Sequence, residues 1–211
     1  MRELSGPEFR PAALRFATLY GLSGRKRFDL AVNRLTAEAK VEGKITIHGG
    51  QQVRPFIHVE DAAEAILALL RAPLPPAGDP VFSIGCDEQN FTIRQIAEMV
   101  RAQVPRAEII VKPLASEPVS YRVQFQKFQA QTGFRPAWSV ERGIRQVLEA
   151  LAGNDVPDYR DVRHSNVGHL QQSRQRNPGA WFGSFALRSA GVPVGKTGGN
   201  ADLPLASGQL R

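Results

Sequence analysis

Residues 49–72 constrain the fold of this chain more than any other stretch of its sequence. A glycine pair, Gly49 and Gly50, signals a turn, and the apolar residues of 53–59 then follow the spacing of a strand. Asp61 stands where a helix N-cap belongs, and the apolar run over 62–72 predicts the helix itself. Arg54 lies on the short strand next to the turn, where a guanidinium can form paired hydrogen bonds to phosphate oxygens. An ordinary strand-to-helix junction with a solvated arginine explains the same residues equally well.

Short apolar strands alternate with helices along much of the chain. Residues 11–21 lack a polar face, which predicts a strand buried on both sides in a parallel sheet. Thr92 and Ser139 are placed as helix N-caps, and Gly43 and Gly133 as helix ends. The alternation predicts an α/β fold. We expect strands over 11–21, 44–48, 53–59, 81–85, 108–112 and 119–123, helices over 29–43, 62–72, 93–104, 126–132 and 139–151, and a proline-rich turn over 73–80.

Composition excludes several classes of protein. No apolar run approaches the roughly 20 residues that cross a bilayer, and the first residues do not resemble a signal peptide. Cys86, the single cysteine, fits a reducing cytoplasm. The net charge of +7 and a pI near 10 are typical of nucleic-acid-binding chains. Because the basic residues are scattered among acids, we expect no nucleic-acid partner. From the lack of a long apolar run and from the single cysteine, we expect no membrane partner and a cytoplasmic location.

The pattern of strands and helices stops near residue 154. We therefore predict one α/β domain over 1–153, an extension over 154–170 and a disordered or loosely attached tail over 171–211, which is rich in Gly, Pro, Ser, Gln and Arg. Within that tail, Gly195-Lys-Thr197 is similar to the end of a phosphate loop. The motif needs a glycine where Ala190 stands and a buried strand before it, so we reject that interpretation.

Four segments form a series that resembles a known family. They are Leu14-Arg-Phe-Ala-Thr-Leu-Tyr-Gly21, Arg27-Phe-Asp-Leu-Ala-Val-Asn33, the segment Gln-x-Arg-x-Phe-x-x-Val-x-Asp around Arg54, and residues 120–143 with Thr132-Gly-Phe-Arg-Pro-Ala-Trp138. In this order they are similar to the NAD-dependent nucleotide-sugar epimerases and dehydratases of the extended short-chain dehydrogenase/reductase family. Residues 159–166 also resemble the closing residues of some members, so the likeness covers roughly residues 9–166.

The resemblance implies which residues hold the ligand. Arg54 would contact the diphosphate of a nucleotide sugar, Arg122 its phosphate or ribose, and Asn33 its nucleotide. Thr18 stands where many members carry an asparagine near the substrate. The strand that passes the nicotinamide places two further residues, Phe16 and Ala17, at the cofactor.

Each candidate residue also has an ordinary structural explanation. Asn33 can be a surface amide, Arg122 the polar face of a strand and Thr18 a β-branched filler. His58 is more typical of a packed strand residue than of a catalyst. The sequence departs from the family at two further positions, since Gln124 and Pro55 stand where aspartates are frequent.

The family's catalytic motif is absent from the 211 residues. In the family, a tyrosinate accepts the substrate proton, and a lysine four residues later lowers the pKa of that tyrosine. The chain has three tyrosines, Tyr20, Tyr121 and Tyr159, and the residues four positions on are Gly24, Phe125 and Arg163. Nor does a Gly-x-x-Gly-x-x-Gly turn occur for a dinucleotide pyrophosphate.

These observations predict the C-terminal part of a Rossmann-like NAD-dependent epimerase/dehydratase fold, with a small substrate-binding subdomain. We expect a site for a nucleotide-diphosphate sugar, no catalytic residue, no metal and no NAD binding by this chain alone. We expect turnover to require a complementary N-terminal half, and a homo-oligomer is also possible. The alternative is a non-catalytic module that binds a ligand or a partner protein.

Overall fold

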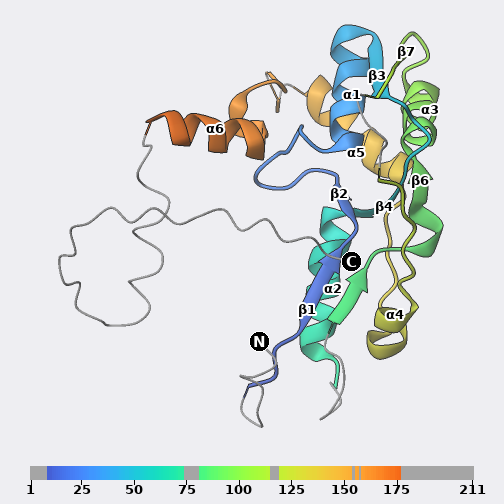
Figure 1. The fold of residues 1–211 in the computed structure, drawn as a ribbon, viewed down its shortest axis with the longest axis vertical. Helices are drawn as coiled ribbons and strands as arrows, with labels where there is room; N and C mark the ends of the chain where they lie inside the picture. Colours follow the sequence, from blue (N-terminus) through green and yellow to red (C-terminus); the bar gives the residue numbers. More distant parts are fainter. Residues whose placement is uncertain (1–8, 74–80, 115–118, 154, 157, 177–211) are drawn as a thin grey trace, which may run out of the picture. The chain divides into compact units, whose positions relative to one another are not determined.

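The computed structural model describes residues 9–73, 81–114, 119–153, 155–156 and 158–176 (Figure 1). The chain divides into two units, residues 1–169 and 170–211, and the first contains the sheets. Strands and helices alternate along it, which confirms the predicted α/β architecture. Most of the predicted turn over 73–80 lies outside the described residues. Among the described residues, no helix is both long and apolar enough to span a membrane.

Three parallel strand pairs organise the sheets. Their members are β1 (Ala13–Phe16) with β5 (Val81–Ile84), β2 (Thr18–Tyr20) with β4 (Val53–His58), and β3 (Lys44–His48) with β7 (Glu108–Lys112). One short strand that we did not predict, β6 (Asn90–Thr92), pairs antiparallel with β4 and completes the sheet order β2-β4-β6.

The strand predicted over 11–21 forms, but in two pieces. Its backbone turns from β1 to β2 at Ala17, whose N–H donates to Ile84 O at 2.9 Å. The prediction of burial on both faces is wrong for β1, because Arg15 is exposed and Phe16 is 38% exposed. The reason is that β1 pairs with β5 alone among the described strands.

Helix ends follow the local signals of the sequence. The helix α1 (Ala31–Glu42) ends at Gly43 with φ 69°, and α4 (Gln126–Thr132) ends at Gly133 with φ 68°. Thr92 and Gln95 form a capping box at the start of α3 (Ile93–Gln103). Ser139 caps α5 (Val140–Ala152) by accepting a hydrogen bond from Arg142 N.

Two local predictions are wrong. The helix α2 (Val59–Arg71) is capped by His58, whose side chain accepts from Glu60 N, and Asp61 lies inside its first turn. Residues 119–123 form no strand. Three hydrogen bonds connect them to the start of β4 without forming a ladder: Val53 N to Ser120 Oγ, Tyr121 N to Val53 O, and the Arg54 side chain to Val119 O.

Further short elements follow from long-range contacts that sequence patterns do not display. They are the 3₁₀ turns η2 (Asp87–Gln89) and η3 (Val162–His164) and the helix α6 (Asn166–Arg176). Helix α6 extends into the first residues of the segment for which we predicted a tail, and residues 177–211 lie outside the described part.

The central strand β4 connects two of the chain's apolar cores. Phe56 is fully buried in a core with α1, α3, α5 and β3, whereas its neighbour Ile57 is fully buried in a second core with α2, α4 and β5. Figure 1 shows these two groups of elements at opposite ends of the ribbon, with β2 and β4 between them. A third, smaller core holds Phe28 and Tyr159. The middle of β4, between Arg54 and His58, is therefore packed on both faces.

Candidate functional site

Arg54 is held at the start of β4 by the backbone of residues 119–121. Its Nη1 donates to Val53 O at 2.8 Å and also to Val119 O. The guanidinium carbon lies 5.0 Å from the centre of the Tyr121 ring, which is within the range of a cation–π contact. These contacts hold the half-buried side chain of Arg54 against residues 119–121, on the strand that follows the Gly49–Gly50 turn.

Arg122 reaches the same sheet through Asn90. Its Nη1 lies 3.4 Å from Asn90 O, a long hydrogen bond, and its side chain is exposed. In the β4–β6 register, Asn90 stands opposite Pro55, the residue that follows Arg54. The structure therefore places both arginines around the β4–β6 pair, although Arg122 lies on irregular chain and not on a neighbouring strand.

Asn90 is a supporting residue that the sequence analysis missed. It is 8% exposed, its Nδ2 donates to Asp87 O at 2.9 Å and to Val123 O at 3.1 Å, and its Oδ1 accepts from Val123 N at 3.0 Å. These bonds fix the backbone beside Arg122. An asparagine before a helix cap carries no sequence signal for contacts with a segment more than thirty residues away.

Asn33 is fully buried, and its side chain forms hydrogen bonds with the backbone of the turn after β2. Its Oδ1 accepts from Gly21 N at 2.9 Å, while Nδ2 donates to Gly21 O at 2.8 Å and to Arg27 O at 2.9 Å. Both amide hydrogens are thereby used within the protein. A contact of Asn33 with a nucleotide stays a prediction, and the structure gives its side chain a different task, which is to shape residues 21–27.

Phe16 ends β1, Thr18 begins β2, and Ala17 lies between the two strands. Thr18 is half-buried and stands opposite Phe56, two residues along β4 from Arg54. Ala17 is 7% exposed and Phe16 is 38% exposed. Thr18 and Arg54 therefore share the sheet β2-β4-β6, whereas Phe16 lies at the edge of the β1–β5 pair.

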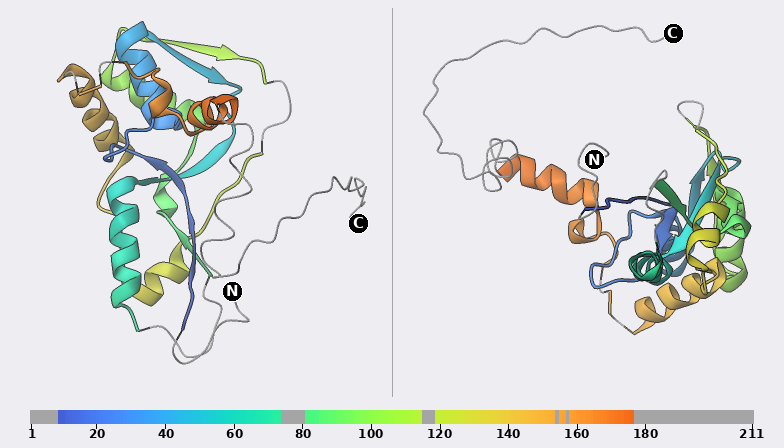
Figure 2. Two further views of the ribbon diagram at one scale, coloured as in Figure 1. Left: turned by 90° about the vertical axis from the view of Figure 1, so that its left-hand side faces the viewer. Right: turned by 90° about the horizontal axis from the view of Figure 1, so that it is seen from below.

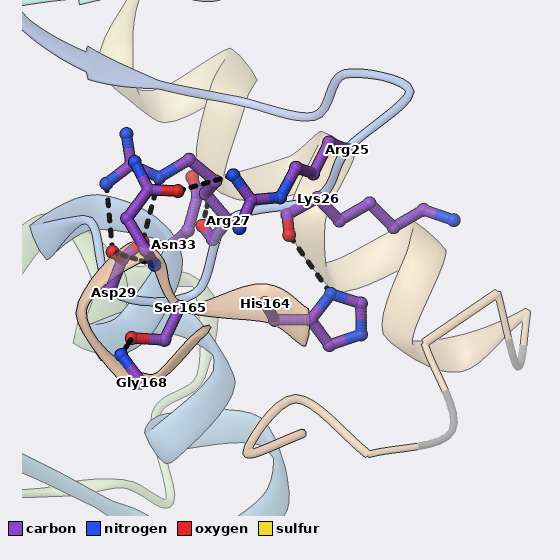
Figure 3. Close-up of polar contacts among 9 residues, drawn as sticks. Arg25, Lys26, Arg27, Asp29, Asn33, His164, Ser165 and Gly168 are labelled. Atoms are coloured by element: carbon purple, nitrogen blue, oxygen red, sulfur yellow. Dashed lines mark hydrogen bonds and ion pairs between the residues drawn. The ribbon is translucent and has the colours of Figure 1, made fainter. Parts of the chain in front are cut away.

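The basic loop over 23–27 is tied to residues 164–166 (Figure 3). Arg27 forms a bidentate ion pair with Asp29, with distances of 3.0 and 2.9 Å, and the same carboxylate accepts from Asn166 N at 2.9 Å. Partial burial would raise the pKa of Asp29, but these hydrogen bonds outweigh it and the pKa is lowered. Arg25 bonds to the Asn166 side chain. The charges of Arg25 and Arg27 thus stabilise the loop itself.

His58 is fully buried, with both ring nitrogens in hydrogen bonds. Its Nδ1 accepts from Glu60 N at 3.2 Å, which leaves Nε2 to donate to Gln146 Oε1 at 3.0 Å. The ring stacks on the Trp138 side chain, with 3.8 Å between the ring centres. Burial lowers the pKa of His58, so the neutral imidazole is favoured. This environment agrees with the prediction of a packed strand residue.

The pKa values of Tyr20, Tyr159 and Cys86 are shifted away from those of a reactive group. Burial raises the pKa of Tyr20, whose hydroxyl donates to Gln89 Oε1 at 2.9 Å. Burial also raises the pKa of Tyr159 to about 12, with a contribution from its bond to Glu42. The pKa of Cys86 is raised to about 11 by burial. A base or nucleophile needs the opposite shift. The described residues contain no group of three metal-ligating side chains.

Part of the chain is similar to a known family. The family model "NAD dependent epimerase/dehydratase family" matches residues 4–85. Over these residues the chain is similar to that family. Arg54, Asn33 and Thr18 lie within the matched residues, and Arg122 lies beyond them.

Solved structures of this family share the fold. The NAD-dependent NDP-hexosamine 5,6-dehydratase TunA, involved in tunicamycin biosynthesis, is 29% identical with a TM-score of 0.59, over 70% of this chain and 47% of that chain. The UDP-glucuronic acid 4-epimerase of Bacillus cereus, solved in complex with UDP-glucuronic acid and NAD, is 26% identical with a TM-score of 0.57, over 67% of this chain and 45% of that one. The predicted Rossmann-like epimerase/dehydratase fold is confirmed.

A putative GDP-L-fucose synthase 2 from Oryza sativa subsp. japonica is 30% identical over 121 residues, which are 56% of this chain and 34% of the relative. Across the curated relatives that it matches, the chain spans between 14% and 34% of their length.

Proposed function

We propose that this chain is the nucleotide-sugar-binding part of an NAD-dependent epimerase or dehydratase, with Arg54 and Arg122 as the clamp on the diphosphate. The observation that carries this proposal is the placement of both arginines around the β4–β6 pair, through Val119 O and Asn90 O. The TunA dehydratase, described as acting on an NDP-hexosamine, supports the substrate class. Thr18, on the same sheet, would face the sugar, and Asn33 would shape the loop beside it.

The chemistry of the two guanidiniums suits a diphosphate. Each can form charge-assisted hydrogen bonds with phosphate oxygens, worth roughly 1.5 to 3 kcal/mol apiece. The exposed Arg122 is available to a ligand, and the Tyr121 ring beneath Arg54 limits its motion. Because the Arg54 side chain is already oriented, less conformational entropy is lost when the ligand binds.

The residues present do not fit NAD by themselves. A dinucleotide pyrophosphate is held by a glycine-rich turn that leads from a strand into a helix. The glycine pair Gly49–Gly50 instead connects two strands, β3 and β4. Phe16 and Ala17 would supply one wall of a cofactor site at most. We therefore propose that NAD and the catalytic base are contributed from outside these 211 residues, in the cytoplasm, and that this chain alone is inactive.

Titration with UDP-glucose and with UDP tests the proposal. We expect calorimetry to show binding to the wild-type chain, and affinity losses of about tenfold or more in Arg54→Ala and Arg122→Ala. Arg54→Lys should restore only part of the loss, because an ammonium cannot form the paired bonds of a guanidinium. Arg106→Ala, which changes an exposed arginine in the turn between α3 and β7, is the matched control and should leave the affinity unchanged.

Salt separates specific contacts from general attraction between charges. Affinities measured at two ionic strengths should all weaken at the higher one, but the ratio between wild type and each variant should persist. Equal affinities for wild type, Arg54→Ala and Arg122→Ala would refute the clamp. A chain that binds no nucleotide sugar but does bind a protein would favour the alternative, a protein-interaction module.

A further inference from the structure

A segment near the end of the described chain is bonded to the loop between β2 and α1. The loop covers residues 21–29, and the segment, which we call the closing segment, covers residues 158–166. Figure 2 shows the closing segment in orange, on the way from α5 to α6. Phe28 N donates to His164 O at 2.9 Å, and the two rings meet edge-on with 5.6 Å between their centres. Because Phe28 is buried in the third core, the closing segment covers a core residue of the loop.

Three further hydrogen bonds connect the closing segment to the loop (Figure 3). Asn166 N donates to Asp29 Oδ2 at 2.9 Å, and the side-chain oxygen of Asn166 accepts from Arg25. His164 Nδ1 lies 3.0 Å from Lys26 O, and because a carbonyl oxygen only accepts, Nδ1 carries the hydrogen. The bond to Asp29 joins residues that are 137 positions apart, so the contact is a product of the tertiary fold.

The closing segment is itself fixed to α1. Tyr159 is 8% exposed, and its hydroxyl donates to Glu42, the last residue of α1. Arg160 forms an ion pair with the same carboxylate at 2.7 Å. Because the segment is attached to a helix as well as to the loop, it reduces the number of conformations that are open to the loop.

The 21–29 loop begins at the end of the sheet where this type of fold binds ligands. In parallel α/β sheets, ligands bind outside the carboxyl ends of the strands. Gly21 follows the last residue of β2, and the first residue of that strand is Thr18, which in our proposal faces the sugar. At about 3.3 Å per residue along a strand, Thr18 and Gly21 are separated by roughly 10 Å. A ligand that contacts Thr18 therefore lies close to the start of the loop.

We propose that His164 and Asn166 are positioning residues of the nucleotide-sugar site, and that they act by holding the 21–29 loop in the conformation that binds the ligand. The side chain of Asn33 already bonds to the backbone of the same loop. A loop that is held by α1 and by the closing segment is ordered before the ligand arrives, so that less conformational entropy is lost on binding. This proposal rests on the proposed function, and it gives the closing segment a part in ligand binding.

The double variant His164→Ala/Asn166→Ala tests the proposal in the full chain. It removes both side-chain contacts with the loop and keeps the attachment of the segment at Glu42. We expect calorimetry to show an affinity for UDP-glucose about three- to tenfold weaker than that of wild type. The matched control is Arg163→Ala, because the exposed guanidinium of Arg163 pairs with Asp161 inside the closing segment. This control should bind like wild type.

Trypsin measures the state of the loop without a ligand. The loop contains three cleavage sites, after Arg25, Lys26 and Arg27. Mass spectrometry should show cleavage at these sites about tenfold faster in the double variant than in wild type, because local opening exposes the backbone. Cleavage after Arg101 in α3 should keep its rate, which separates release of the loop from general unfolding. The single variant Asn166→Ala, a milder change, should give intermediate values for both affinity and cleavage.

Several results would overturn the proposal. Faster loop cleavage with unchanged affinity would refute a role in binding, and weaker binding without faster cleavage would refute an action through the loop. Equal acceleration after Arg101 would show that the substitutions unfold the chain. The proposed function fails separately: if Arg54→Ala and Arg122→Ala weaken binding and the double variant does not, only the positioning role is refuted. If the wild-type chain binds no nucleotide sugar, the proposed function is refuted and the positioning role falls with it.

Discussion

At the scale of single residues, His58 joins segments that are far apart in the sequence. Its imidazole contacts Tyr20 edge-on at 5.2 Å, stacks on Trp138 and donates to Gln146. Gln146 Oε1 accepts a second hydrogen bond from Leu22 N at 3.0 Å. One neutral ring thereby connects β2, β4 and α5, so its protonation state affects the stability of the fold.

We predict that the fold loses stability as the pH falls from 7.5 to 5. The unfolded chain binds a proton at His58 near pH 6.5, whereas burial lowers the pKa of His58 in the folded chain. Protonation therefore favours the unfolded state below about pH 6.5, by at most about 1.4 kcal/mol per pH unit for one proton. Urea unfolding at several pH values measures the slope. His58→Gln should remove most of it, and His48→Gln, at an exposed position, should leave it intact.

The carboxylates with shifted pKa values do not explain a dependence of the unfolding free energy on pH between 7.5 and 5. Asp29 and Glu42 have lowered pKa values in the folded chain, so the stability they add is lost only in the more acidic range where carboxylates titrate. A flat unfolding free energy between pH 7.5 and 5 would contradict the role of His58. So would a His58 ring whose NMR chemical shift titrates at or above the ordinary histidine pKa.

Asp61 shows how a buried carboxylate positions a loop. It is 3% exposed, its Oδ1 accepts from Ala137 N at 2.9 Å, and its Oδ2 accepts from Trp138 N at 3.0 Å. Arg142 extends the arrangement, because its guanidinium lies 4.5 Å from the centre of the Trp138 ring. The sequence marks Asp61 as important beside a helix start, but it does not show that its partners lie about 76 residues away.

At the scale of elements, the turn after β2 depends on Gly21. Its φ of +88° is in the region that favours glycine, and a Cβ there would lie 2.0 Å from His58 Nε2. We predict that Gly21→Ala destabilises the chain by about 2 to 5 kcal/mol, from backbone strain together with overpacking. Gly24→Ala, in the same exposed loop with no atom within 4 Å of its Cβ position, should change stability by less than about 0.5 kcal/mol. Thermal unfolding of both variants compares them, and equal melting temperatures would contradict the prediction.

Elements with strong local signals were predictable from the sequence. The helix α3 has a capping box, α1 has a C-terminal glycine, and β3 has a strict alternation, so each of them formed within a residue or two of its predicted bounds. Residues 119–123 did not form the predicted strand. They form isolated hydrogen bonds with Val53 of β4 and Asn90 of β6 instead of a continuous series of backbone bonds. Likewise, η3 and the start of α6 depend on long-range bonds to the 26–29 loop, which no local pattern displays.

For the candidate site too, the sequence indicates residues with a local signal but not the residues that contact them in the fold. Arg54 stands next to a glycine turn, and that local context indicated it. The residues that support it, Val119, Tyr121 and Asn90, approach through the tertiary fold and carry no periodicity. Asn33 was selected through the resemblance, but only the structure shows that both of its amide hydrogens bond to the backbone.

At the scale of the whole molecule, our proposal is that the chain binds the substrate of an epimerase/dehydratase and does not itself move a proton or a hydride. We predict that the purified chain, incubated with NAD and UDP-glucose, shows no formation of NADH or of a new nucleotide sugar. The reason is that Tyr20, Tyr121 and Tyr159 each lack a lysine four residues later, and that burial raises the pKa of Tyr20 and Tyr159 away from the range of a general base. Absorbance at the NADH band and chromatography of the nucleotide sugars measure the two products, with a complete epimerase as the positive control. Turnover above a buffer blank that survives repurification would contradict this prediction, and would require a base other than a Tyr-x-x-x-Lys tyrosine among these 211 residues.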